Sequence, residues 1–255
     1  MSLLEAFVVT LAGVGAGAIN TIVGSGTLIT FPTLLFFGYP PLVANMSNNV
    51  GLVPGGMSGL YGYRRELTGQ GVLVRRLIPM SLLGGLTGAL LLLVLPASVF
   101  DAVVPALIGL GLLLVMFGPR LQAAARAHHG EEQTAVRRTL LPAAVYGSGI
   151  YGGYFGAAQG VITAGFLTVL LPIPLQVVNA IKNVLVPIVN LTAAVVFVAL
   201  RWSDIDWAAA ALIGVGSLLG GFIGAGIGRR LPSPVLRGVI IVVGTIAILK
   251  LTVFA

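Results

Sequence analysis

Polar side chains cluster at two places in an otherwise apolar chain, and each cluster begins at an interruption rich in glycine or alanine. The first cluster contains Ser25, Gly26, Thr27, Asn45, Asn48 and Asn49. The second contains Gln159, Gly160, Asn179, Lys182 and Asn183. Hydroxyl, amide and ammonium groups can all donate hydrogen bonds to an oxyanion. The chemistry that these residue types favour is therefore the binding of a small anion.

Lys182 is the charged residue that lies deepest within an apolar run, eight residues after Pro174 and nineteen before Arg201. A lysine near a helix end commonly snorkels to the headgroups. An ionisable residue inside a membrane is by default a functional site, and we favour that interpretation here. The acidic residues all lie near predicted loops: Glu5, Glu66, Asp101, Glu131, Glu132, Asp204 and Asp206. With no buried acid as a partner, Lys182 is expected to receive its counter-ion as an anionic substrate, and a proton exchanged at Lys182 could accompany that substrate.

The interruption at residues 24–26 predicts a break between two helices at membrane depth. A half-helix that begins there would direct unpaired N–H groups and its positive dipole end into the protein. We expect Ser25, Thr27 or Thr30 to cap this start, and Pro32 to fall in the first turn. Close packing of helices on the glycines is an equally open interpretation. Packing alone is expected for a second set of glycines: Gly84, Gly85, Gly88, Gly220, Gly221 and Gly224.

The composition determines which elements must position these residues. The chain has 255 residues, 57% of them hydrophobic and 8% charged, and its mean hydropathy is +1.06. Continuous apolar runs predict an all-α polytopic membrane protein embedded in the lipid bilayer and exclude an outer-membrane barrel. The net charge of +7 does not indicate nucleic acid, because the basic residues lie in loops between spans. The expected location is the plasma membrane, here a bacterial inner membrane, with multiple passes.

The chain also repeats itself. Residues 81–99 align with residues 217–235, and upstream positions align at a shift two residues smaller. We therefore divide the chain into a first membrane repeat (1–118), a cytoplasmic linker (119–139) and a second membrane repeat (140–255). The predicted segments are 4–23, 27–39, 42–62, 74–95 and 99–118, then 141–156, 160–173, 175–200, 207–228 and 234–254. Whether 27–39 and 160–173 span the bilayer or re-enter is left open.

The charges of the loops predict that the two repeats are inverted. Three loops carry eleven of the 14 basic residues, namely Arg64, Arg65, Arg75, Arg76, Arg120, Arg126, Arg137, Arg138, Arg229, Arg230 and Arg237. All three loops lie on the cytoplasmic side, as the positive-inside rule requires, only if the repeats face opposite ways.

The segment GSGTLITFPTLLFFGYPPLVANMSNNV, followed by YGYRREL and a degenerate second copy, resembles the sulfite exporter TauE/SafE family of membrane proteins. The resemblance implies a transporter, and by its founding examples an exporter, of sulfite or an organosulfonate. The second copy departs from the usual glycine triplet and carries Lys182, so the substrate is not carried over.

We therefore expect a secondary anion transporter that works by alternating access, with no cofactor and no enzymatic activity. A passive anion channel or uniporter would use the same site and is the alternative. A membrane-embedded enzyme is disfavoured, because the chain has no cysteine and no intramembrane histidine or acid. A structural subunit would show no stabilisation by substrate. Substrate, direction, coupling ion and oligomeric state, including a homodimer, are not given by the sequence.

Overall fold

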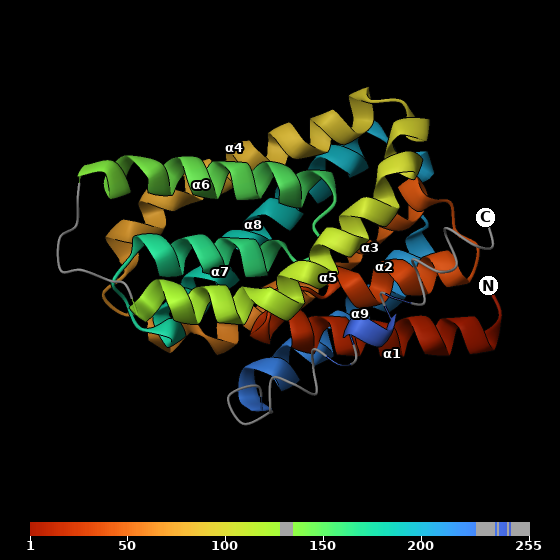
Figure 1. Ribbon diagram of the computed structural model, residues 1–255. Coiled ribbons are helices and arrows are strands. Elements are labelled where there is room, and N and C mark those ends of the chain that lie inside the picture. The colour runs from red at the N-terminus through yellow and green to blue at the C-terminus, as the bar shows by residue number, and fades with distance from the viewer. Residues whose placement is uncertain (128–134, 228–237, 239, 244, 246–255) are drawn as a thin grey trace.

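The computed structural model describes residues 1–127, 135–227, 238, 240–243 and 245, and within them it is all-helical (Figure 1). The first half of the chain contains α1 (Leu3–Ile22), α2 (Thr27–Phe36), α3 (Pro41–Gly62), α4 (Gly71–Val94) and α5 (Ala97–Ala127). The second half contains α6 (Ala135–Tyr154), α7 (Gln159–Leu170), α8 (Leu175–Leu200) and α9 (Trp207–Ile227). Two short 3-10 helices, η1 (Arg64–Leu67) and η2 (Trp202–Asp204), lie in the loops before α4 and α9. The loop with Arg229, Arg230 and Arg237 and most of the predicted segment 234–254 lie outside the described residues.

Five of the described helices are long and apolar enough to cross a membrane: Leu3–Ile22, Gly71–Val94, Ala97–Gly118, Leu175–Leu200 and Trp207–Gly226. The helices α2 and α7 are shorter, with 10 and 12 residues. At about 1.5 Å per residue they reach only about 15 and 18 Å, against about 30 Å of hydrocarbon. Both are therefore half-helices, and neither crosses the bilayer as a helix.

Helices extend into the predicted linker, residues 119–139, from both sides. The helix α5 continues to Ala127, and α6 begins at Ala135, several residues before the predicted start at 141. The alanine-rich stretch at the end of α5 has high helix propensity, so helix continues after the apolar run has ended. The paired histidines His128 and His129 lie outside the described residues.

Close packing of the long helices depends on glycine. A Cβ at Gly88 in α4 would lie 2.1 Å from the carbonyl oxygen of Ile150 in α6, and one at Gly220 in α9 would lie 2.0 Å from that of Val14 in α1. Neither position can hold a side chain, so backbone meets backbone, as small residues permit in membranes. The same holds for Gly84, Gly221 and Gly224, and a Cβ at Gly85 would lie in tight contact, 3.1 Å from the Cα of Val189. The prediction that these glycines serve packing is confirmed.

These contacts join the two halves of the chain, since α1 packs on α9 and α6 packs on α4. Figure 1 shows α1 and α9 toward the lower edge of the view and α4 and α6 along the upper edge, with α8 between them. The two halves are therefore interlocked.

The order of the contacts gives the direction of each helix. From Gly13 to Gly17 of α1 the neighbours advance from Ile213 to Ser217 of α9, so these two helices are parallel. By the same comparison, α3 is parallel to α9, and α4 is parallel to both α6 and α8. The helices α3 and α8 are antiparallel. Thus α1 runs opposite to α6, α3 runs opposite to α8, and α4 runs opposite to α9.

Candidate functional site

The two helix breaks touch each other in the interior. The backbone N–H of Gly160, near the start of α7, donates to the carbonyl oxygen of Gly24 at 2.9 Å. Gly24 has a φ of +88°, and a Cβ there would lie 2.4 Å from the Cα of Gly160. Glycine is therefore required at position 24 both by its conformation and by the backbone opposite it.

The start of α2 is held differently from the prediction. Its N-cap is Gly26, which makes no side-chain cap hydrogen bond, and the hydroxyl of Ser25 has no hydrogen-bond partner among the described residues. The predicted capping by Ser25, Thr27 or Thr30 is therefore wrong. The two threonine hydroxyls instead contact Asn48 of α3, which accepts from Thr30 and donates to Thr27 at 3.4 Å.

The position of Pro32 in α2 differs from the prediction, and the role of Gly26, which the prediction left open, is resolved. Pro32 is the sixth residue of the helix rather than part of its first turn, so the carbonyl of Leu28 receives no i+4 hydrogen bond. Gly26 lies against α1, where an added Cβ would be 2.5 Å from the carbonyl oxygen of Ala16. Gly26 thus serves packing, whatever the N–H groups beside it bind.

The second break is organised by hydroxyl groups. The start of α7 follows Ala158, which has a left-handed φ of 58°. The hydroxyl of Tyr151 in α6 donates to the carbonyl oxygen of Ala157 at 2.6 Å. The hydroxyls of Ser148 and Thr163 are 2.6 Å apart, and Thr163 also donates to the carbonyl of Gln159 at 3.0 Å. The break is therefore held by α6 on one side and by the first turn of α7 on the other.

Lys182 of α8 is fully buried, with 0% of its surface exposed, so the snorkelling interpretation is wrong. Its Nζ donates to the carbonyl oxygens of Asn20 and Thr21 at 3.1 and 3.0 Å, and the amide of Asn183 donates to Thr21 at 3.1 Å. Both carbonyls belong to the last turn of α1. A cation at a carboxyl-terminal helix end is stabilised by the helix dipole.

A related contact occurs at the other break. The amide of Asn45 in α3 donates to the carbonyl oxygen of Tyr154, the last residue of α6, at 3.0 Å. Thus α8 holds the end of α1, and α3 holds the end of α6. The polar runs of α3 and α8 make similar contacts with the ends of helices from the other half of the chain, and of these two runs α8 brings the charge.

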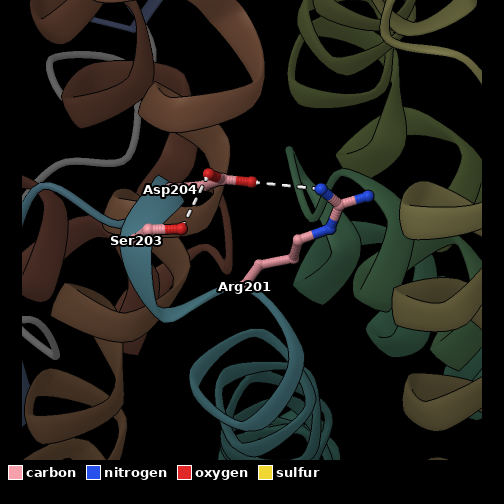
Figure 2. Close-up of polar contacts among 3 residues, drawn as sticks. All are labelled: Arg201, Ser203 and Asp204. Atoms are coloured by element: carbon pink, nitrogen blue, oxygen red, sulfur yellow. Dashed lines mark hydrogen bonds and ion pairs between the residues drawn. The ribbon is translucent and has the colours of Figure 1, made fainter.

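No carboxylate balances that charge within the described residues. Among the described residues an ion pair joins Arg201 and Asp204, with 3.4 Å between nitrogen and oxygen. It lies in the loop between α8 and α9, where Asp204 also accepts a hydrogen bond from Ser203 (Figure 2). An ammonium has three N–H donors, and the two carbonyls of α1 use two of them. Lys182 can therefore hold a further acceptor, and a charged one would be favoured.

Unpartnered polar atoms mark the same region. Buried oxygens without a hydrogen-bond partner include Ser25 Oγ at the first break, Gln159 Oε1 at the start of α7, and Asn49 Oδ1 on α3. All three residues are more than nine-tenths buried. Buried polar groups normally find partners, so exceptions call for a bound ligand or water. These atoms favour a site where the breaks meet.

The remaining predicted residues lie mostly at the first break. Asn48 contacts Thr27 and Thr30 of α2, and Asn183 contacts the end of α1, whereas Asn179 is half-buried and is assigned to no described contact. The sequence analysis did not single out Thr21, whose carbonyl is shared by Lys182 and Asn183, or Tyr151, whose hydroxyl holds the second break. A tyrosine just before a glycine-containing break was the available signal for Tyr151.

Other features of the described residues do not suit an anion or a metal. An apolar groove of about 220 Å³ between α5 and α7 is lined by residues such as Leu114, Val161 and Phe166. Within the part of the chain described, no group of three or more His, Asp or Glu side chains could hold a metal ion.

The described residues form a multi-pass helical bundle in which two helix breaks touch and a buried cation has no acid beside it. This is the architecture of a membrane transporter, in which half-helix ends line the binding site. The family comparison agrees. The family model described as "Sulfite exporter TauE/SafE" matches residues 9–251. The chain belongs to this family.

Similar proteins are named as membrane transporters. The chain is 30% identical to "Probable membrane transporter protein YfcA" of Escherichia coli strain K12, over 92% of this chain and 85% of that protein. It is 30% identical to a "Probable membrane transporter protein" of Haemophilus influenzae, over 84% and 81%, and 26% identical to one of Sinorhizobium, over 92% and 88%. No solved structure matches. With its membrane-spanning helices and bacterial relatives, the chain is a multi-pass protein of the bacterial inner membrane.

Proposed function

We propose that this transporter moves a small anion through a site formed where the two helix breaks meet. The observation that carries the proposal is the environment of Lys182, which is fully buried, is bonded only to uncharged groups, and has no acid beside it in the described structure. A buried ion is costly unless it is paired. An anionic substrate would complete the pair and remove this cost.

The backbone at the breaks adds little to this charge. The half-helices α2 and α7 start there, and the first N–H groups of a helix have no partner one turn earlier in that helix. At both starts most of these groups already donate to other backbone carbonyls, for example Gly160 to Gly24 and Ile29 to Gly26. Side chains would therefore complete the site: the unpartnered hydroxyl of Ser25 can donate to an anion, whereas the unpartnered amide oxygens of Asn49 and Gln159 accept and would bind water or a protonated ligand. Asn48 and Asn183 would support them from α3 and α8.

Alternating access follows from the proposal that the repeats are inverted, at residues 1–118 and 140–255. The antiparallel directions of matching helices and the exchanged packing of α1 on α9 and α6 on α4 support it. If the repeats exchange conformations, the site opens first to one side of the membrane and then to the other. The Gly24–Gly160 contact would then lie on the barrier between the two openings.

The family name supports sulfite or an organosulfonate as the substrate and export as the direction. Proton coupling through Lys182 would follow if its ammonium releases a proton when the anion leaves. A homodimer does not enter this mechanism, because each chain carries its own site.

Anion uptake into proteoliposomes tests the function. Wild-type protein should transport radiolabelled sulfite, Lys182→Gln should not, and Arg201→Gln should behave as wild type because Arg201 lies in a loop. Equal sulfite flux in the Lys182→Gln protein would refute the site. A proton gradient distinguishes the mechanisms: accumulation of sulfite against its own gradient requires a secondary transporter, whereas a channel or uniporter only equilibrates it.

A further inference from the structure

We propose that the site selects singly charged anions and rejects doubly charged ones of the same size. The inference rests on the proposed function and deepens it by naming the charge of the substrate.

The charge count comes from the side chains around α8. Lys182 is the fully buried charged residue of the described structure. The other charged residues on the described helices that pack against α8 lie near helix ends or in loops, away from the middle of the bundle. They are Glu5 of α1, Arg64, Arg65 and Glu66 of η1, Arg75 and Arg76 of α4, Arg137 and Arg138 of α6, and Asp204 of η2. The fixed side-chain charge at the site is therefore +1.

The helix dipoles do not add to this count. Each break brings together the carboxyl end of one helix and the amino end of the next: α1 with α2, and α6 with α7. An amino end carries about +0.5 charge and a carboxyl end about −0.5, so the two contributions at each break oppose each other. They orient a ligand but supply little net charge.

A monoanion beside Lys182 forms a neutral pair, whereas a dianion leaves one negative charge buried without a partner. An uncompensated buried charge is far more costly than a compensated one. The same argument makes a weak dibasic acid enter in its half-protonated form. Sulfite, SO3²⁻, would first take a proton from water, leaving hydroxide in solution, to give HSO3⁻, and this ion would bind. The proton then crosses on the substrate, so proton transport of this kind would not require Lys182 to release its own.

Methanesulfonate and sulfate provide a matched pair for the test. Both have tetrahedral sulfur, and a methyl group in one replaces a charged oxygen in the other, so they differ mainly in charge. Dissociation constants are measured on wild-type protein in lipid nanodiscs at fixed ionic strength. Methanesulfonate should bind at least about tenfold more tightly than sulfate, because the second negative charge of sulfate would be buried without a partner. Lys182→Arg keeps the charge and should keep the preference.

Asn48→Lys is the sharper variant, because Asn48 holds the repeat position equivalent to Lys182 on α3 and is also buried. A second ammonium there should reverse the preference toward sulfate. If this variant fails to fold, the comparison of methanesulfonate with sulfate on the wild-type protein tests the proposal by itself. Sulfate binding as tightly as methanesulfonate would overturn the charge rule while leaving an anion transporter. If neither ion binds, and no other anion binds or crosses the membrane, the proposed function itself fails.

Discussion

Replacing Lys182 with methionine separates a charge held for substrate from a charge held for structure. Lys182 donates two hydrogen bonds, at 3.1 and 3.0 Å, to the end of α1. Hydrogen bonds to charged groups contribute about 1.5–3 kcal/mol each. If Lys182 served only to hold the end of α1 in place, its replacement should lower the free energy of unfolding by roughly 3–6 kcal/mol.

Our account predicts a smaller loss. The ammonium has no acid partner in the described structure, and the effective penalty for burying an ion is several kcal/mol. Methionine removes this penalty together with the two hydrogen bonds, and Asn183 still donates to Thr21. The two effects oppose each other, so the free energy of unfolding without ligand should change by no more than about 2 kcal/mol.

The assay is reversible unfolding in mixed micelles, with and without anion. An anion at about 100 times its dissociation constant should stabilise the wild type by about 2.7 kcal/mol and should not stabilise Lys182→Met. Arg201→Met is the control, because it removes an exposed charge paired at 3.4 Å and should preserve both stability and the response to anion. A loss above about 3 kcal/mol in Lys182→Met, with the anion response retained, would refute the reasoning.

Three further predictions test the helix breaks and the packing. Gly24→Ala should impair folding, because the backbone is left-handed there and the new Cβ would lie 2.4 Å from Gly160; wild-type yield and melting temperature would contradict this. Gly88→Ala should lower the melting temperature strongly, since its Cβ would lie 2.1 Å from a carbonyl oxygen, whereas Gly147→Ala, with open space around it, should not. Asn45→Leu should leave the end of α6 without a donor and cost about 1–3 kcal/mol in unfolding free energy, and no change would show that the 3.0 Å bond is dispensable.

The helices and their breaks could be predicted because the bilayer enforces them. Backbone polar groups in lipid must be satisfied within a helix, so the apolar runs had to be helical. The break before α2 was visible as Gly24, whose positive φ few other residues adopt. The end of α5 was missed, because a helix in water after Gly118 depends on propensity rather than on hydropathy.

The burial of Lys182 was also predictable, but its partners were not. Asn20 and Thr21 act through backbone carbonyls more than 160 positions away in sequence, and a carbonyl oxygen has no residue signature. The same reason explains the wrong capping prediction for α2. Ser25 and Thr27 have side chains suited to a cap, but Thr27 and Thr30 contact Asn48, which lies on another helix. Which of several suitable partners a side chain takes is decided by tertiary packing.

The most direct test of the central claim is an experimental structure of the wild-type protein with methanesulfonate bound. The account predicts density for the anion within hydrogen-bonding distance of Lys182 Nζ, close to the starts of α2 and α7. Density only outside this region, with Lys182 bonded to Asn20 and Thr21 alone, would contradict it.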